Sequence, residues 1–347
     1  MTEAQIIVIA TPAFLLLIGL EFTYGKLVGK NTYRLFDAMS SISAGILSQL
    51  TNIMVKALGF GVYLGAFELL AVRPLSNDSL WVWISAVILY DFCYYWNHRA
   101  GHRITLLWAA HAVHHQSEDY NLSTALRQTS TGWIFSWIFY LPLAILGYPP
   151  EVIAVVGLID LLYQYWVHTE HVPKLGWFDR IFCSPSNHRV HHAVNAEYLD
   201  KNYGGIFVLW DRIFGTFKEE DELIPCVYGT RSHLQDWSPI NANLQVYRER
   251  WRETKRSSGL INKAKLWLLG PEWRPTPEDR NPFNLAFRKY EPKTNSPQRT
   301  LSISIFCTAL LAVTGLLWFS ELLAWQSIAC GTLIIAILLH IGMHQPS

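Results

Sequence analysis

Long apolar stretches restrict the fold of this chain more than any other feature of its sequence. A helix needs about 20 apolar residues to cross the hydrocarbon core of a bilayer. Stretches near that length run over residues 6–22, 42–72, 80–96, 301–319 and 322–341, and a shorter apolar hairpin covers residues 133–146 and 152–167. The sequence therefore predicts an all-α fold, a multi-span integral membrane bundle of helices.

The overall composition agrees with a membrane protein and excludes several other classes. Hydrophobic residues make up 51% of the 347 residues, which is high for a soluble chain. The formal charge is only +1 and the basic residues are scattered, so the sequence shows no nucleic-acid footprint. The five cysteines form no CxxC pair, which argues against a disulfide framework and against a zinc ribbon.

Positive residues beside the first apolar stretch predict how the chain is oriented. Lys26, Lys30 and Arg34 follow that stretch, whereas the head before it carries Glu3 and no Lys or Arg. We therefore expect a retained first span rather than a signal peptide, and a cytoplasmic loop after it. The stretch 42–72 is either one tilted span or a span with a re-entrant piece. If it crosses once, the histidine clusters of the chain form a cytoplasmic cap. If it crosses twice, the clusters would lie on the opposite side of the membrane.

Histidine is the unusual residue, because 10 of the 13 histidines fall between His98 and His192. Residues three and four positions apart share one face of a helix, so clusters with that spacing are expected to aim their imidazoles at one point. Three clusters have the spacings HxxxH, HxxHH and HxxHH: His98 and His102, then His111, His114 and His115, then His188, His191 and His192. His168 adds a ninth candidate ligand and His171 a weaker one. The isolated histidines are interpreted as packed or solvated: His233, His340 and His344.

The number of histidines says more about the metal than their chemistry does, because imidazole binds iron, copper, zinc and nickel alike. Eight or nine nitrogens exceed what one tetrahedral zinc ion takes, and they suit two metal ions with positions left open for O2 or substrate. The ExxH motif of soluble di-iron bundles does not occur in the sequence. Two irons would therefore be held mainly by histidine, with water or hydroxide as the bridge.

Carboxylates near the clusters are the candidate catalytic residues, expected to orient the histidine rings by hydrogen-bonding their free nitrogens. The candidates are Asp91, Glu118, Asp119 and Glu170, with Asp211 as a further one. Asp91 lies seven residues before His98 and inside an apolar stretch, where an acid is a functional hypothesis by default. Its alternative interpretation is a helix cap or an ion pair with Arg99 or Arg103.

The three clusters, in this order and between membrane spans, are similar to those of the fatty acid hydroxylase and sterol desaturase superfamily of membrane di-iron enzymes. Within it, residues 108–128, which include Glu118-Asp119-Tyr120-Asn121, resemble the alkylglycerol monooxygenase branch. Residues 163–170, 185–192, 200–205 and 209–217 resemble that branch as well. The close likeness covers residues 91–217, and a looser one covers residues 80–239.

The resemblance implies a membrane-bound monooxygenase that uses O2 to hydroxylate a lipid, with two Fe ions and tetrahydrobiopterin as cofactors. In the alkylglycerol branch, hydroxylation beside the ether oxygen gives a hemiacetal that collapses to an aldehyde and glycerol. Two positions depart from the family pattern: Asn187 stands where a further histidine is expected, and His171 replaces an apolar residue. Both departures bear on pterin use and on ether specificity.

Oxidation of an unactivated C–H bond needs chemistry that no amino-acid side chain supplies. No GxGxxG follows a predicted strand, and no haem or iron–sulfur cysteine motif occurs, so the electron donor must be external. The expected partners are the lipid substrate, O2, this external electron donor and the membrane, without nucleic acid. Arg99, Arg127 and Arg189 either contact a lipid head group or pterin, or pair with local acids.

Other functions remain open for the same residues. A sterol, a fatty acyl chain or a carotenoid is an alternative substrate, with hydroxylation or desaturation as the reaction. A transition-metal transporter is the alternative of another class, although its ligands would lie near the bilayer midplane in broken helices. We expect four segments: N-terminal membrane spans (1–79), a fatty acid hydroxylase-like catalytic region (80–240), a polar cytoplasmic segment (241–300) and a C-terminal membrane hairpin (301–347).

Overall fold

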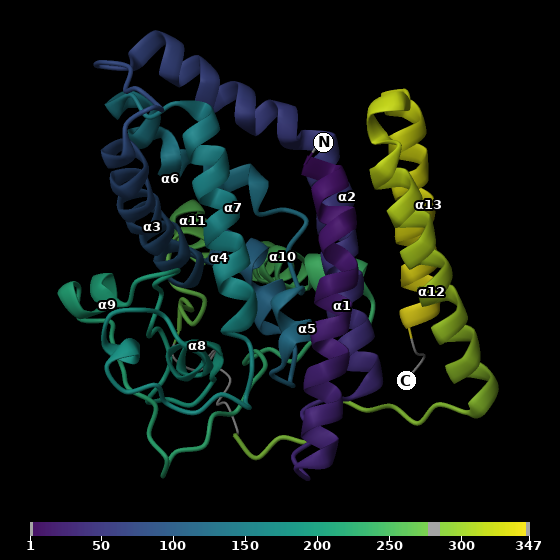
Figure 1. Cartoon of the computed structure of the whole chain (residues 1–347). Helices are drawn as coiled ribbons and strands as arrows, with labels where there is room; N and C mark the ends of the chain where they lie inside the picture. Colours follow the sequence, from purple (N-terminus) through teal and green to yellow (C-terminus); the bar gives the residue numbers. More distant parts are fainter. Residues whose placement is uncertain (1–2, 277–284, 345–347) are drawn as a thin grey trace.

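The apolar stretches of the sequence fold as helices in the computed structural model, which describes residues 3–276 and 285–344 (Figure 1). Within these residues no β-strand forms, and the extended pairings are two isolated bridges, Phe182 with Phe207 and Ala193 with Tyr228. The expected all-α fold is therefore confirmed. Residues 277–284 of the polar segment expected over 241–300 lie outside the described residues.

In the described part of the chain the helices follow one another, with the short 3-10 turns η1 and η3 among them. In order they are α1 (Glu3–Leu27), α2 (Leu35–Leu70), α3 (Leu80–Arg103), α4 (Thr105–His115), α5 (Leu122–Ala125), α6 (Trp133–Leu146), α7 (Pro150–Trp166), η1 (Phe178–Arg180), α8 (Pro185–His192), α9 (Leu209–Ile213), α10 (Pro239–Arg256), α11 (Leu260–Leu268), α12 (Ser296–Trp318), η3 (Ser320–Leu322) and α13 (Trp325–Met343).

Among the described residues, three helices are long and apolar enough to cross a membrane, namely α1, α12 and α13. They correspond to the stretches predicted over residues 6–22, 301–319 and 322–341. The long stretch over 42–72 lies in α2, which bends by 48° between Leu35–Val55 and Leu58–Leu70 and makes a fourth candidate if the bent pair is one span. Helices of this length and apolarity make the chain an integral membrane protein.

The other apolar stretches form helices that build the scaffold of the site. The stretch 80–96 is the first part of α3, whose second half turns polar, and the apolar hairpin forms α6 and α7. These helices pack through small and aliphatic side chains such as Ala86, Leu143 and Val156. Gly147 ends α6 with a left-handed φ of 94°, and a Cβ there would lie 2.0 Å from the carbonyl oxygen of Arg73. Only glycine therefore suits this turn.

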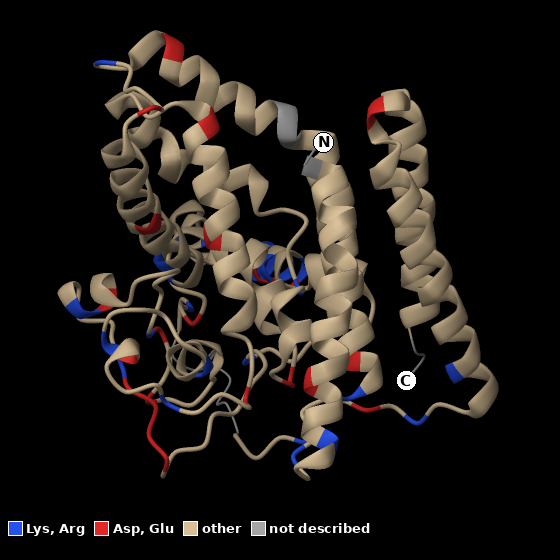
Figure 2. Ribbon diagram, viewed as in Figure 1, with Lys and Arg blue, Asp and Glu red and all other residues tan. Residues whose placement is uncertain are grey.

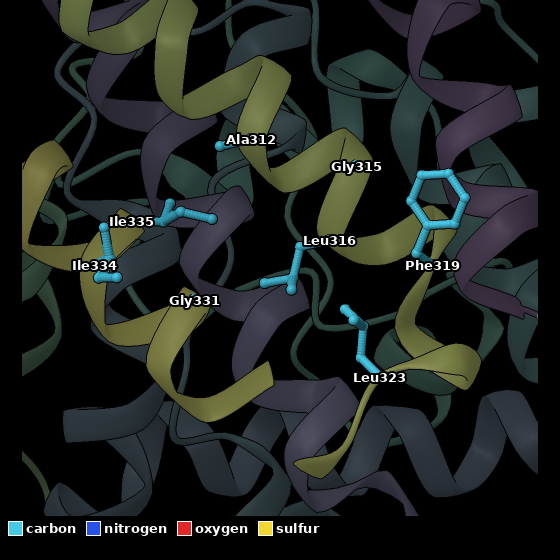
Figure 3. A pocket seen from close by; sticks show the side chains of 8 residues that line it. All are labelled: Ala312, Gly315, Leu316, Phe319, Leu323, Gly331, Ile334 and Ile335. Atoms are coloured by element: carbon cyan, nitrogen blue, oxygen red, sulfur yellow. The ribbon is translucent and has the colours of Figure 1, made fainter. Parts of the chain in front are cut away.

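The C-terminal pair α12 and α13 packs against α2 through Leu50, Ala309, Val313 and Leu339. Between these two helices lies an apolar pocket of about 480 Å³, lined by side chains such as Leu316 and by two glycines (Figure 3). Charged residues are sparse along α1, α12 and α13 and concentrate at the loop-rich end of the molecule (Figure 2). The same end holds α8 and α9 (Figure 1).

Candidate metal centre

Four segments bring nine histidines together at the loop-rich end of the bundle. The end of α3 carries two of them, α4 carries three, the segment just after α7 carries one, and α8 carries three. The nitrogen atoms form two groups, within each of which all ligand atoms lie within 4.8 Å of one another. The first group is His98, His102, His111, His115 and His191, and the second is His114, His168, His188 and His192.

Each HxxHH cluster is divided between the two groups, and the expectation that every cluster aims at one point was wrong. Each residue turns about 100° around the helix axis, so positions four apart point nearly the same way while consecutive ones diverge. Accordingly His188 and His192 join the second group, whereas His191 joins the first. In α4 the pair His111 and His115 joins the first group, and the histidine between them joins the second. The two helices therefore link the two groups.

Hydrogen bonds to backbone carbonyls fix the protons on several rings. His114 Nδ1 lies 2.9 Å from the carbonyl oxygen of Arg127, and His168 Nδ1 lies 2.8 Å from that of Gln164. A carbonyl oxygen only accepts, so both Nδ1 atoms donate and both neutral rings present an Nε2 lone pair. These two Nε2 atoms lie 3.2 Å apart. Two lone pairs at that distance repel each other unless a cation lies between them.

The protonation state of the buried rings points the same way. Desolvation by burial lowers the pKa of His114 to about 4 and that of His98 to about 3. The rings are therefore neutral at physiological pH, which is the form that binds a metal. The Nε2 atoms of His102 and His191 are buried without a hydrogen-bond partner in the described part of the chain. Such atoms cost free energy unless they are ligands.

The distances between the nitrogens suit a shared ion. Bonds of about 2.1 Å from one metal to two imidazoles place the two nitrogens roughly 3.0–3.4 Å apart, depending on the angle. His98 Nε2 and His115 Nε2 each lie 3.1 Å from His111 Nε2 in the first group. In the second group His192 Nε2 lies 3.1 Å from His188 Nε2. The residues present therefore fit one ion in each group.

A reciprocal cap sets the start of α8. The Ser184 hydroxyl oxygen accepts from the backbone N–H of Asn187. In return, the side-chain oxygen of Asn187 accepts from the backbone N–H of Ser184 at 3.2 Å. Pro185 occupies the first helical turn, where its missing N–H costs nothing. Asn187, which departs from the family pattern, is thus a capping residue.

Two buried acids hold the loop that faces the first group. Asp91 accepts from the backbone N–H of Ile206 at 2.6 Å, from that of Phe207 and from the Trp210 indole. Asp211 accepts from the N–H groups of residues 203 and 204, each at 2.8 Å. The same loop offers the Tyr203 carbonyl oxygen to His98 Nδ1 at 2.8 Å. The acids therefore act on the ring through the backbone.

The other predicted carboxylates lie outside both histidine groups. Asp119 accepts from the Arg34 guanidinium at 2.9 Å and from Lys289 at 2.7 Å. Glu118 accepts from the backbone N–H of residue 290 at 2.7 Å. Glu170 pairs with Lys30 at 3.2 Å. These contacts fasten the loop after α1 and the segment before α12 onto the site.

The three predicted arginines make local contacts. Arg127 is fully buried and donates to the Val113 carbonyl, to the Ser40 hydroxyl and to Gln116. Arg189 forms a bidentate pair with Glu220, at 2.8 and 2.7 Å. The Arg99 guanidinium donates to the Tyr95 hydroxyl at 3.0 Å.

Sequence reasoning missed Asp160, Gln164 and Tyr120. Asp160 is buried in α7 and accepts from the side-chain amide of Gln164 at 2.7 Å. The backbone carbonyl of Gln164 accepts from His168 Nδ1 and so orients that ring. The signal was present, because Asp160 precedes His168 by eight residues in an apolar stretch, much as Asp91 precedes its histidine by seven. Tyr120 lies with its ring centroid 5.2 Å from that of His192.

The sequence model of the fatty acid hydroxylase family matches residues 83–216. This range includes Asp91, Asp211 and all nine histidines of the candidate metal centre. Residues 83–216 form a fatty acid hydroxylase domain. The domain thus contains every element of the candidate metal centre. No solved structure matches the chain.

Curated relatives extend the likeness beyond this domain. Alkylglycerol monooxygenase of Homo sapiens is 43% identical over 267 residues, which are 77% of this chain and 59% of the human protein. Alkylglycerol monooxygenase of Danio rerio is 41% identical over 267 residues, again 77% of this chain and 59% of the relative. That of Xenopus tropicalis is 36% identical over 291 residues, 82% of this chain and 65% of the relative. The chain therefore spans about three fifths of the length of the curated relatives it matches.

Proposed function

We propose that this chain is a membrane-bound, O2-dependent oxidoreductase that hydroxylates a lipid with two irons, one held by each histidine group. The observation that carries the proposal is the facing pair of unprotonated nitrogens, His114 Nε2 and His168 Nε2, inside a set of nine neutral imidazoles. Two adjacent ions with histidine ligands and open positions suit O2 activation better than a structural zinc site does. The fatty acid hydroxylase domain supports the same reaction class.

In this proposal the irons supply the oxidising chemistry, and the protein holds and shields them. Backbone carbonyls of Arg127, Gln164, Lys201 and Tyr203 accept from the Nδ1 atoms of four ligand rings, which keeps each Nε2 free for a metal. Such partners fix ring orientation and raise the basicity of the ligand. Burial of the rings keeps water out and leaves the site to a lipid that arrives through the apolar bundle.

The substrate proposal follows the relatives. We propose an alkylglycerol, hydroxylated on the carbon beside the ether oxygen, so that the hemiacetal collapses to an aldehyde and glycerol. One oxygen atom of O2 enters the lipid and the other leaves as water, which requires two electrons and two protons from an external donor. A reduced pterin, tetrahydrobiopterin, is the proposed donor. A sterol or fatty acyl substrate would keep the same metal centre.

We propose that the histidine centre lies on the cytoplasmic side of the membrane. Lys26 lies in the last turn of α1 and Lys30 in the loop after it, where it pairs with Glu170. This end of α1 lies at the loop-rich end of the molecule (Figure 1), and positive residues favour the cytoplasmic face. Ser258, in the exposed loop after α10, offers a test in intact cells. A Ser258→Cys variant should react with an impermeant maleimide only after lysis, measured relative to the unmodified chain. Equal reaction in intact cells would place the centre outside.

The decisive experiment combines metal content with product analysis on detergent-purified protein. About two irons per chain and a fatty aldehyde from an alkylglycerol with tetrahydrobiopterin are expected. Iron without the aldehyde would keep the metal centre and reject this substrate. Protein that carries no transition metal after gentle purification, and takes up none when iron is added back, would refute the proposed function.

A further inference from the structure

A pocket of about 710 Å³ lies beside the second histidine group, at the end of α1. We call it the α1 pocket. Its wall includes Tyr24, Lys30, His171, Arg189, Cys226 and Tyr228. The volume is in the range that suits a small molecule rather than a protein segment. None of the nine histidines of the metal centre lines it.

The wall of the α1 pocket combines aromatic faces with charged and hydrogen-bonding groups. Lys30 and Glu170 form an ion pair at 3.2 Å, in which the lysine side chain is 54% exposed. Arg189 is held rigidly by Glu220. The His171 Nε2 atom is buried without a partner among the described residues, and its ring lies edge-on, 5.3 Å from Tyr24. Such a wall suits a flat ligand with polar edges.

A stack of aromatic rings joins the α1 pocket to the second histidine group. Tyr228 in the wall stacks on Tyr120 with centroids 4.8 Å apart and planes 16° apart. Tyr120 then stacks on His168 at 5.6 Å and 30°. The Tyr120 hydroxyl donates to the Val167 carbonyl at 2.9 Å, which fixes the ring. Both tyrosines are buried, at 1% and 7% exposure. Two rings in contact therefore span the whole path from the pocket to a candidate ligand.

We propose that the α1 pocket binds the small, flat, reducing heterocycle that supplies the electrons, and that Tyr228 and Tyr120 conduct them to the second histidine group. This inference rests on the proposed function. The donor loses two electrons and two protons, the lipid C–H bond takes one oxygen atom of O2, and the other atom leaves as water. Electron tunnelling weakens steeply with distance, so a path of touching rings favours transfer here over transfer through the apolar bundle.

The position of the pocket agrees with this role. Its lining residues come from the end of α1, from the segment after α7, from α8 and from the segment after α9, and these elements lie at the charged, loop-rich end of the molecule (Figures 1 and 2), which a water-soluble donor can reach. A lipid reaches the centre from the apolar helices instead. Donor and substrate therefore approach the centre from different sides, and neither blocks the other.

The test removes the first ring of the stack. In Tyr228→Leu the ring is lost, whereas Tyr228→Phe keeps it and loses only the hydroxyl. Tetrahydrobiopterin is the probe, measured by equilibrium binding and by the rate at which it reduces the irons without O2. We expect Tyr228→Leu to bind tetrahydrobiopterin about tenfold more weakly, or to pass its electrons to the irons about tenfold more slowly. Loss of a stacked aromatic contact predicts a change of this size. Tyr228→Phe should retain more binding and transfer than Tyr228→Leu, and Trp251→Leu, at an exposed aromatic outside the pocket, should stay near the unmodified protein.

Two further measurements separate the possible outcomes. Iron content and reduction by dithionite, which is small and needs no dedicated site, should be the same in all variants. If Tyr228→Leu binds tetrahydrobiopterin and transfers its electrons like the unmodified chain, or if the unmodified chain does not bind it, the pocket proposal is overturned. If the unmodified chain binds it and Tyr228→Leu does not, yet no lipid is oxidised with either reductant, the proposed function fails and the pocket stands.

Discussion

The Nε2 atoms of His114 and His168 lie 3.2 Å apart, and each ring uses its other nitrogen to donate to a backbone carbonyl. The two histidines come from α4 and from the segment just after α7, 54 residues apart in the chain. Because neither nitrogen carries a proton, a cation between them turns a repulsion into two bonds. This pair therefore gives the most direct test of the metal centre.

Replacing His114 by Ala should remove metal from the second group and leave the first occupied. We expect about half of the iron to be lost and lipid oxidation to stop, because the remaining three rings no longer enclose the ion. Iron per chain is measured by mass spectrometry. The matched control is His344→Ala, since His344 lies at the end of α13 and contacts Asp236. Full iron content and activity in His114→Ala would contradict the assignment.

Removal of the metal should destabilise the folded chain. A ligand that binds only the native state at about 100 times its Kd adds roughly 2.7 kcal/mol to the free energy of unfolding. Without ions, neutral nitrogens such as His191 Nε2 stay buried and unpaired. Chelated protein in detergent should therefore melt at a lower temperature than untreated protein, and added Fe(II) should restore it. An unchanged melting temperature after complete removal would argue against a structural contribution of the metal.

Asp91→Asn should loosen the loop that orients His98. The Asp91 carboxylate accepts three hydrogen bonds, and an amide offers only one acceptor oxygen and adds two donors that face N–H groups. We expect a loss of about 1–3 kcal/mol in the free energy of unfolding, together with reduced iron in the first group. Thermal unfolding and metal analysis measure both. Asp78→Asn, in an exposed loop, should change neither quantity. Normal iron binding in Asp91→Asn would show that the loop needs no such clamp.

Loss of the α8 cap should affect the metal as well as the stability. Ser184→Ala removes the acceptor for the N–H of Asn187, at a cost of about 1 kcal/mol. Asn295→Ala removes the equivalent cap from α12 and is the control, because α12 carries none of the nine histidines. Both variants should unfold more easily, and only Ser184→Ala should bind less iron. Equal iron in the two variants would show that α8 is held in place without its cap.

Much of the bundle follows from local patterns. The apolar length of residues 6–22, 301–319 and 322–341 predicts helices, and the structure has α1, α12 and α13 there. The break in α2 and the short arms α6 and α7 depend on packing. For residues 42–72, the sequence pattern alone left open whether they form one tilted span or a span with a re-entrant piece. Helices α3 and α7 lie side by side because Ala86 and Val156 belong to one core.

Eight of the nine candidate histidines were predicted from spacing, because i, i+3 and i+4 positions share a helix face whatever the tertiary structure is, and His168 was added as a ninth candidate. Their division into two groups was not predicted. Consecutive residues such as His114 and His115 diverge by about 100°, and only the placement of α3, α7 and α8 around α4 decides which ring meets which. The role of the carboxylates also depended on the fold. Asp91 lies near the site in sequence, yet its partners are backbone N–H groups 115 and more residues away.

The amino-acid sequence predicts the kind of protein and its candidate metal ligands, because membrane length and helical spacing are local properties of the chain. The tertiary structure decided how the ligands divide, which carbonyls hold their rings and where the α1 pocket meets the Tyr228–Tyr120 stack. Each of these relationships joins segments that are far apart in the chain. Long-range packing, which no local pattern encodes, brings them into contact.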